Sequence, residues 1–74
     1  MIKNKSNIGE LLKNLTSFSY EKDDRMVDVQ LITEESVNIR YYDEKCITIN
    51  YHQYEDAVSQ LFKDRKYINK VLFQ

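Results

Sequence analysis

The chain has 74 residues and a formal net charge of −1, and its 42% hydrophobic and 31% charged residues are typical of a small soluble globular protein. A chain of this length buries only about 60% of the surface that it exposes when unfolded, so most of its strongly apolar side chains are needed for the core. We therefore expect one domain over residues 1–74, with no enclosed substrate cavity, no enzymatic activity and no cofactor.

The sequence gives no sign of a membrane span or of export. Its longest uninterrupted apolar runs, such as residues 71–73, are only three residues long, which is far too short to cross a bilayer. The charged residues 1–5 are not followed by the apolar stretch of a secretory signal. The single cysteine, Cys46, cannot form an intramolecular disulfide. These features predict a cytoplasmic protein without a membrane partner.

The first predicted element is a helix over residues 7–17. Asn7 followed three residues later by Glu10 resembles a capping box at its start. The polar and aperiodic residues 20–25 then predict an exposed connection. The helix would carry one apolar stripe, formed by Ile8, Leu11, Leu12 and Leu15.

Three strands should follow, because apolar and polar residues alternate in three segments between Met26 and Tyr51. The connections at residues 33–36 and 43–45 are too short for a crossover helix, so neighbouring strands should pair antiparallel. The side chains on the apolar face would be Val27, Val29, Leu31, Val37, Ile39, Tyr41, Ile47, Ile49 and Tyr51.

From about residue 53 the pattern becomes helical again and continues almost to the end of the chain. A helix of 20 residues is about 30 Å long, whereas a strand of six residues spans about 20 Å. The helix must therefore overhang the sheet or break near Asp64. An overhanging Val71, Leu72 and Phe73 would offer a patch for a homodimer or a partner, unless these side chains pack against the first helix.

The predicted fold is α+β in the order α-β-β-β-α, with a three-stranded antiparallel sheet and both helices on one face. This order resembles the double-stranded RNA-binding domain, in which the last helix begins with a lysine-rich motif that grips phosphates. The corresponding residues 52–57 here hold two acids and no lysine. Direct nucleic-acid binding is therefore only an alternative interpretation.

The charges divide along the chain. Residues 21–56 carry ten acidic and four basic side chains, whereas residues 1–20 have a net charge of +2 and residues 57–74 a net charge of +3. Such an asymmetry can steer a charged partner onto one end of a protein. The acidic connections could imitate nucleic acid, or the basic residues 63–66 could touch phosphates, or the charges could serve solubility alone.

Acidic loops on such a chain are similar to those of the small anti-CRISPR proteins, encoded by phages and plasmids, that inhibit type II-A effector nucleases. The resemblance lies in architecture and loop charge, and it implies a protein that occupies the duplex-DNA site of a basic nuclease. It implies that the mimicking carboxylates are Glu34, Glu35, Asp43 and Glu44. The net charge of −1 is milder than a dedicated DNA mimic would carry.

The second candidate contact surface is the sheet face opposite the helices, where Arg40 and Tyr42 should lie on a mixed polar and apolar surface. We predict no catalytic residue and no metal ligand. Cys46 and His52 would be about 20 Å apart along an extended segment, and one cysteine with one histidine cannot complete a zinc site. The sequence thus favours a non-enzymatic accessory or inhibitory protein that binds another protein, with a nucleic-acid-binding module or a self-associating structural domain as alternatives.

Overall fold

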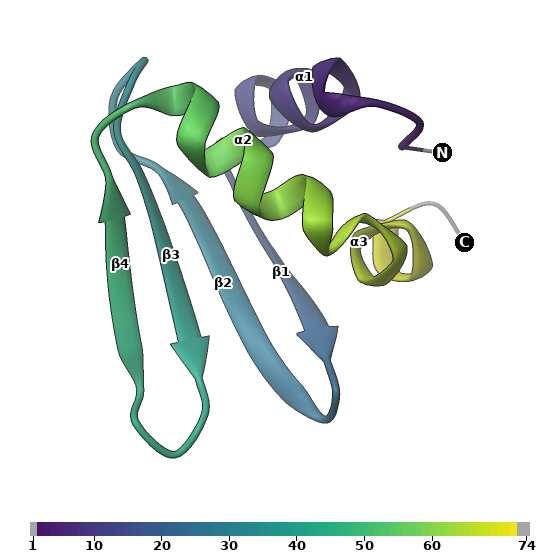
Figure 1. The fold of residues 1–74 in the computed structure, drawn as a ribbon, viewed down its shortest axis with the longest axis vertical. Helices are drawn as coiled ribbons and strands as arrows, with labels where there is room; N and C mark the ends of the chain where they lie inside the picture. The colour runs from purple at the N-terminus through teal and green to yellow at the C-terminus, as the bar shows by residue number, and fades with distance from the viewer. Residues whose placement is uncertain (1, 73–74) are drawn as a thin grey trace.

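The structure is a computed structural model that describes residues 2–72, with side chains to residue 71. These residues form helix α1 (Lys5–Leu15), strands β1 (Ser17–Lys22), β2 (Arg25–Leu31), β3 (Val37–Tyr42) and β4 (Ile47–Tyr51), and helices α2 (Tyr54–Lys63) and α3 (Arg65–Leu72) (Figure 1). The strands make one antiparallel sheet in the order β1-β2-β3-β4. The predicted α+β class and antiparallel sheet are confirmed. The predicted numbers of three strands and two helices are wrong, because residues 2–72 contain four strands and three helices.

The additional strand is β1, in a segment predicted to be the end of a helix and an exposed connection. Helix α1 ends at Leu15, and Thr16 follows with a φ of 58°, so the chain turns there and becomes extended. Phe18 and Tyr20 then alternate with polar residues and are buried. In the register with β2, Tyr20 lies opposite Val27. Two apolar residues were too few to stand out in the sequence.

The start of α1 also differs from the prediction. Asn4, rather than Asn7, is the N-cap, and its side chain accepts a hydrogen bond from the Asn7 amide at 3.3 Å. The Asn7 side chain accepts in return from the Asn4 amide at 3.0 Å. The capping box therefore lies three residues earlier than predicted, and Glu10 takes no part in it.

The break near Asp64, one of the two outcomes that the helix length allowed, is present. Helix α2 ends at Lys63 and α3 begins at Arg65. The turn directs α3 against β1, so that Ile68 joins the core instead of overhanging the sheet. Of the predicted apolar patch at the chain end, Val71 is exposed, whereas the side chain of Leu72 and the whole of Phe73 lie outside the described residues.

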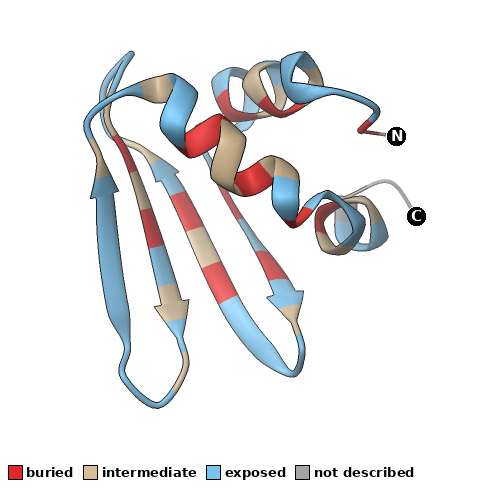
Figure 2. Cartoon of the chain, viewed as in Figure 1, coloured by how far each residue is buried: buried red, intermediate tan, exposed pale blue. Residues whose placement is uncertain are grey.

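The core lies between one face of the sheet and the helices of residues 2–72 (Figure 2). It contains thirteen buried apolar residues, namely Ile2, Ile8, Leu12, Phe18, Tyr20, Val27, Val29, Val37, Ile39, Ala57, Val58, Leu61 and Ile68. Ile2 also donates a backbone hydrogen bond to the Asn69 side chain at 2.8 Å, which joins the first described residues to α3.

The cover over the sheet is incomplete at β4. Ile47 and Ile49 have the parity of the buried residues and were predicted to point into the core, and they do lie on the helix side of the sheet. They are nevertheless 44% and 40% exposed. Figure 2 shows β4 exposed along almost its whole length beside buried positions on β2 and β3. The helical layer therefore ends before the sheet does.

Candidate protein-binding surface

The four carboxylates named as candidate mimics of phosphate lie in two pairs at opposite ends of the sheet. Glu34 and Glu35 belong to the connection between β2 and β3, whereas Asp43 and Glu44 follow β3. A six-residue strand separates the two pairs (Figure 1), which corresponds to about 20 Å. The four carboxylates therefore form two separate pairs, because consecutive hairpin connections in a meander alternate between the two ends of the sheet.

Each end gathers further acids. The β1–β2 turn, with Asp23 and Asp24, lies at the same end as the β3–β4 connection (Figure 1), since Met26 after that turn pairs with Tyr42. At the other end, Glu55 at the start of α2 lines a shallow hollow together with Glu34, Glu35 and Lys13. We call these sets the turn end (Asp23, Asp24, Asp43, Glu44) and the loop end (Glu34, Glu35, Glu55).

Asp43 differs from the other predicted carboxylates because it holds its own loop together. Its side chain accepts hydrogen bonds from the amides of Lys45 at 2.9 Å and Cys46 at 3.1 Å. Glu34, Glu35 and Glu44 are exposed. Among the described residues, no ion pair involves any of these three. They can therefore meet a partner without loss of internal contacts, whereas replacing Asp43 would disturb the loop.

No helix of residues 2–72 covers the sheet face that is turned away from the core (Figure 2). We call it the open face. Arg40 and Tyr42 both lie on it, and the Arg40 guanidinium is 5.3 Å from the centre of the Tyr42 ring. Its three cross-strand rows are Ser17, Gln30, Asn38 and Asn50; Ser19, Asp28, Arg40 and Thr48; and Glu21, Met26 and Tyr42.

Apolar and polar groups are mixed on the open face. Met26 and Tyr42, which pair across β2 and β3, are 43% and 42% exposed. Beside them, Asp28 accepts a hydrogen bond from Ser19 at 2.5 Å. Tyrosine, methionine and arginine are the residue types enriched in protein interfaces. The composition thus suits a contact with another protein.

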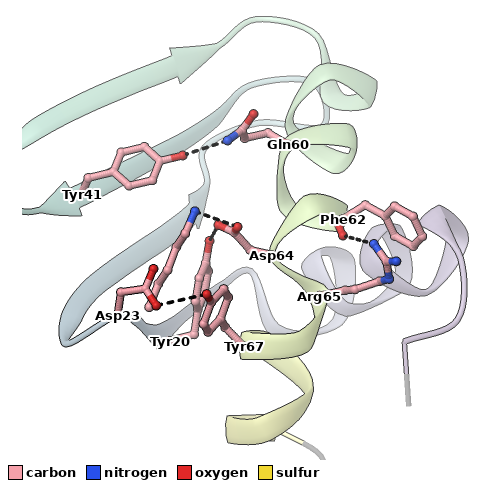
Figure 3. Close-up of polar contacts among 9 residues, drawn as sticks. Tyr20, Asp23, Tyr41, Gln60, Phe62, Asp64, Arg65 and Tyr67 are labelled. Carbon is pink, nitrogen blue, oxygen red and sulfur yellow. Dashed lines mark hydrogen bonds and ion pairs between the residues drawn. The ribbon is translucent and has the colours of Figure 1, made fainter.

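A buried polar cluster that the sequence analysis missed lies on the other side of the sheet (Figure 3). Asp64 is almost fully buried and accepts a hydrogen bond from the Tyr20 hydroxyl at 2.7 Å. The Lys22 ammonium lies 2.9 Å from the same carboxylate. The position of Asp64, three residues after Leu61 and four before Ile68, was the available signal, because it continues the apolar stripe.

This cluster is structural in its chemistry. Burial, and then the hydrogen bond to Asp64, raise the pKa of Tyr20, so its hydroxyl stays protonated and cannot act as a base. The hydrogen bond to Asp64 also raises the pKa of Lys22, although partial burial opposes it. Asp64 accepts the hydrogen bond of Tyr20 and pairs with the Lys22 ammonium, and these two contacts fix the α2–α3 junction to β1.

The remaining candidate groups for catalysis and metal binding are Cys46 and His52 and the carboxylates of residues 2–72. Cys46 and His52 lie at opposite ends of β4. Within residues 2–72, no three histidine, cysteine, aspartate or glutamate side chains are grouped so that they could hold a metal ion. Over the same residues, no helix combines the length and apolar character needed to cross a membrane.

Comparison of the chain with protein-family models, curated proteins and solved structures finds no significant match.

Proposed function

We propose that this protein acts by binding a basic partner protein through its open face and the two acidic ends of its sheet. The observation that carries the proposal is the uncovered sheet face itself, with Arg40, Tyr42 and Met26 between the turn end and the loop end. A sheet with one face on the core and one exposed is common. The exposed aromatic, methionine and arginine side chains inside an acidic rim favour a specific partner, because these residue types are enriched at protein interfaces.

Charge complementarity indicates the chemistry of that partner. Residues 17–52, which form the sheet and its connections, carry eight acidic and four basic side chains, and Lys22 among the latter is bound to Asp64 on the helix side. Basic side chains are exposed instead on and around α1 and α3, namely Lys3, Lys5, Lys13, Lys63, Arg65, Lys66 and Lys70. This separation would orient the open face toward a positively charged surface.

A nucleic-acid-binding protein is the partner that this layout fits best, and inhibition by occupation of its basic site is part of the proposal. About 20 Å of duplex carries about a dozen phosphate charges. The two acidic ends would imitate only the phosphates at two patches, separated by the length of one strand. The partner should therefore present two basic patches at that separation, with an apolar or aromatic surface between them.

The test compares single charge reversals that change the net charge equally. Glu44→Lys alters the turn end, whereas Glu10→Lys alters exposed α1 on the helix side. The partner is first recovered from an extract of the source organism with the unaltered protein, and its affinity is then measured for each purified variant. We expect Glu44→Lys and Tyr42→Ala to weaken binding about tenfold and Glu10→Lys to leave it unchanged.

Equal binding by all three variants would contradict the proposal. So would inhibition that survives when Tyr42→Ala and Glu44→Lys are combined. Circular dichroism of each variant should show the unaltered fold, because Glu44 and Tyr42 are exposed.

A second candidate function, direct binding of nucleic acid by the helices, rests on the seven exposed basic side chains on and around α1 and α3. Two of them face carboxylates, which weakens their attraction for phosphate: Lys13 borders the hollow at the loop end, and Lys70 borders one with Asp23 and Asp24. Fluorescence anisotropy with duplex and single-stranded oligonucleotides would distinguish the two functions. Binding that falls steeply with added salt would favour this second candidate.

A further inference from the structure

The two edges of the sheet are protected to different degrees. The strand at one edge, β1, packs against α1 and α3 and carries Glu21 and Lys22. The strand at the other edge, β4, has the sequence ITINY, with no charge and no proline. An edge strand without charge, proline or cover has unpaired backbone groups that can pair with another strand.

The side chains of β4 add an apolar contact on the helix side of the sheet. Ile49 pairs with buried Ile39, and Ile47 with half-buried Tyr41, yet the outer sides of both isoleucines are exposed. Within the described sheet, β4 is hydrogen-bonded to β3 on one side and has no strand on its other side. A strand added at this edge would therefore cover both the backbone and the two isoleucines.

We propose that β4 pairs antiparallel with β4 of a second copy of this chain, which would join two sheets of four strands into one. In the pairing centred on Ile49, Ile47 lies opposite Tyr51 of the second copy and Thr48 lies opposite Asn50. Ile49 lies opposite itself. Pairs of an aromatic with a β-branched residue, and polar pairs that hydrogen-bond, stabilise antiparallel sheets.

Self-complementarity favours a second copy over an unrelated strand. A twofold axis through Ile49 brings no charged residue opposite another within the strand, and it keeps the isoleucines of both copies on the same face. A stable interface buries about 800 Å² per partner. Pairing of one five-residue strand covers a smaller area, so the dimer should dissociate on dilution. The open face remains accessible in the dimer, and the inference is independent of the proposed function.

The flanks of the strand determine how salt acts. In the antiparallel pair, Asp43 and Glu44 before β4 approach Glu55 and Asp56 after β4 of the second copy. These like charges repel one another, so added salt should leave the dimer unchanged or strengthen it. Binding of a basic partner should weaken with salt instead, which separates failure of one proposal from failure of the other.

Cysteine cross-linking tests the register directly. Residues directly opposite in an antiparallel pair have Cα atoms about 4.5–5.5 Å apart, within the range of a disulfide. In a Cys46→Ser background, Ile49→Cys should form a disulfide-linked dimer under mild oxidation. Met26→Cys is the control, because Met26 is equally exposed but lies on β2. Thr48→Cys is a second control, because it lies opposite Asn50 rather than itself.

Sedimentation velocity over increasing concentration supplies the second measurement. The unaltered chain should pass from monomer to dimer, and Ile49→Lys should weaken the dimer by about a hundredfold, because it places two charges opposite each other. Met26→Lys should leave dimerisation unchanged. A chain that stays monomeric at millimolar concentration, a dimer indifferent to Ile49→Lys, or cross-linking at Met26 or Thr48 equal to that at Ile49 would overturn the proposal.

Discussion

Asp64 shows how one residue fixes the direction of a helix. It lies between α2 and α3, and its backbone carbonyl accepts hydrogen bonds from the amides of Tyr67 at 3.0 Å and Ile68 at 3.2 Å. Its side chain is held at the same time by Tyr20 and Lys22 of β1. A buried carboxylate without such partners would be strongly unfavourable. The position of α3 therefore depends on a contact with a strand 44 residues earlier.

Replacing this residue should lower the free energy of unfolding. We expect Asp64→Ala to cost about 2 kcal/mol, because it leaves the buried Tyr20 hydroxyl without an acceptor. Asp64→Asn should cost less, because the amide oxygen still accepts from Tyr20. Urea denaturation followed by circular dichroism measures both changes, with exposed Glu10→Ala as the control. Equal stability of Asp64→Ala and the unaltered chain would show that the cluster contributes nothing.

At the scale of single elements, the β1–β2 turn places two consecutive residues at positive φ. Asp23 and Asp24 have φ values of 51° and 64°, which is the left-handed region that a type I′ hairpin turn requires at both central residues. Aspartate tolerates this region better than most residues, but glycine enters it without steric cost. Asp23 also accepts a hydrogen bond from the Tyr67 hydroxyl at 3.2 Å, so Asp24 is the residue to replace.

We expect Asp24→Gly to raise the free energy of unfolding by about 0.5 kcal/mol, after the greater flexibility of the unfolded glycine is subtracted. Asp24→Val should lower the free energy of unfolding by about 1 kcal/mol or more, because a β-branched residue is poorly accommodated at positive φ. Thermal unfolding of the two variants beside the unaltered protein makes the comparison. A loss of stability on Asp24→Gly would show that the aspartate side chain has a role in the turn beyond its backbone.

The sequence predicted the elements whose pattern is local. Strands β2 and β3 were expected from alternating β-branched residues and a short connection, and the possible helix break at Asp64 from length alone. Strand β1 was missed because Phe18 and Tyr20 are its only large apolar residues. The exposure of Ile49 could not be read from β4, since it depends on where α2 crosses the sheet. The separation of Glu34 from Glu44 could have been deduced from the predicted meander, because the connections before and after one strand lie at opposite ends of that strand.

At the scale of the whole molecule, the acidic ends should act independently on a partner. They are separated by about 20 Å, which is more than twice the Debye length of about 8 Å at physiological salt. Charge reversals at sites so far apart should add. The effect of Glu34→Lys and Glu44→Lys together on the affinity for the partner should therefore equal the sum of the single effects in free energy.

A double-mutant cycle on the recovered partner measures this sum. An interaction free energy above about 0.5 kcal/mol would contradict independence, and it would indicate that the partner couples the two ends by changing shape. As a reference, the same cycle is measured with Glu10→Lys in place of Glu34→Lys or of Glu44→Lys, because Glu10 lies on α1 and away from both acidic ends.

The order in which the core is covered has a consequence for synthesis of the protein in the cell. The four strands precede α2 and α3 in the chain, so during translation the meander leaves the ribosome while its apolar face still lacks Val58, Leu61 and Ile68. A sheet whose apolar face is only partly covered exposes hydrophobic surface that favours aggregation. The nascent sheet is therefore prone to aggregation until residues 54–72 have emerged, and a chaperone that shields it until then would raise the yield of native molecules.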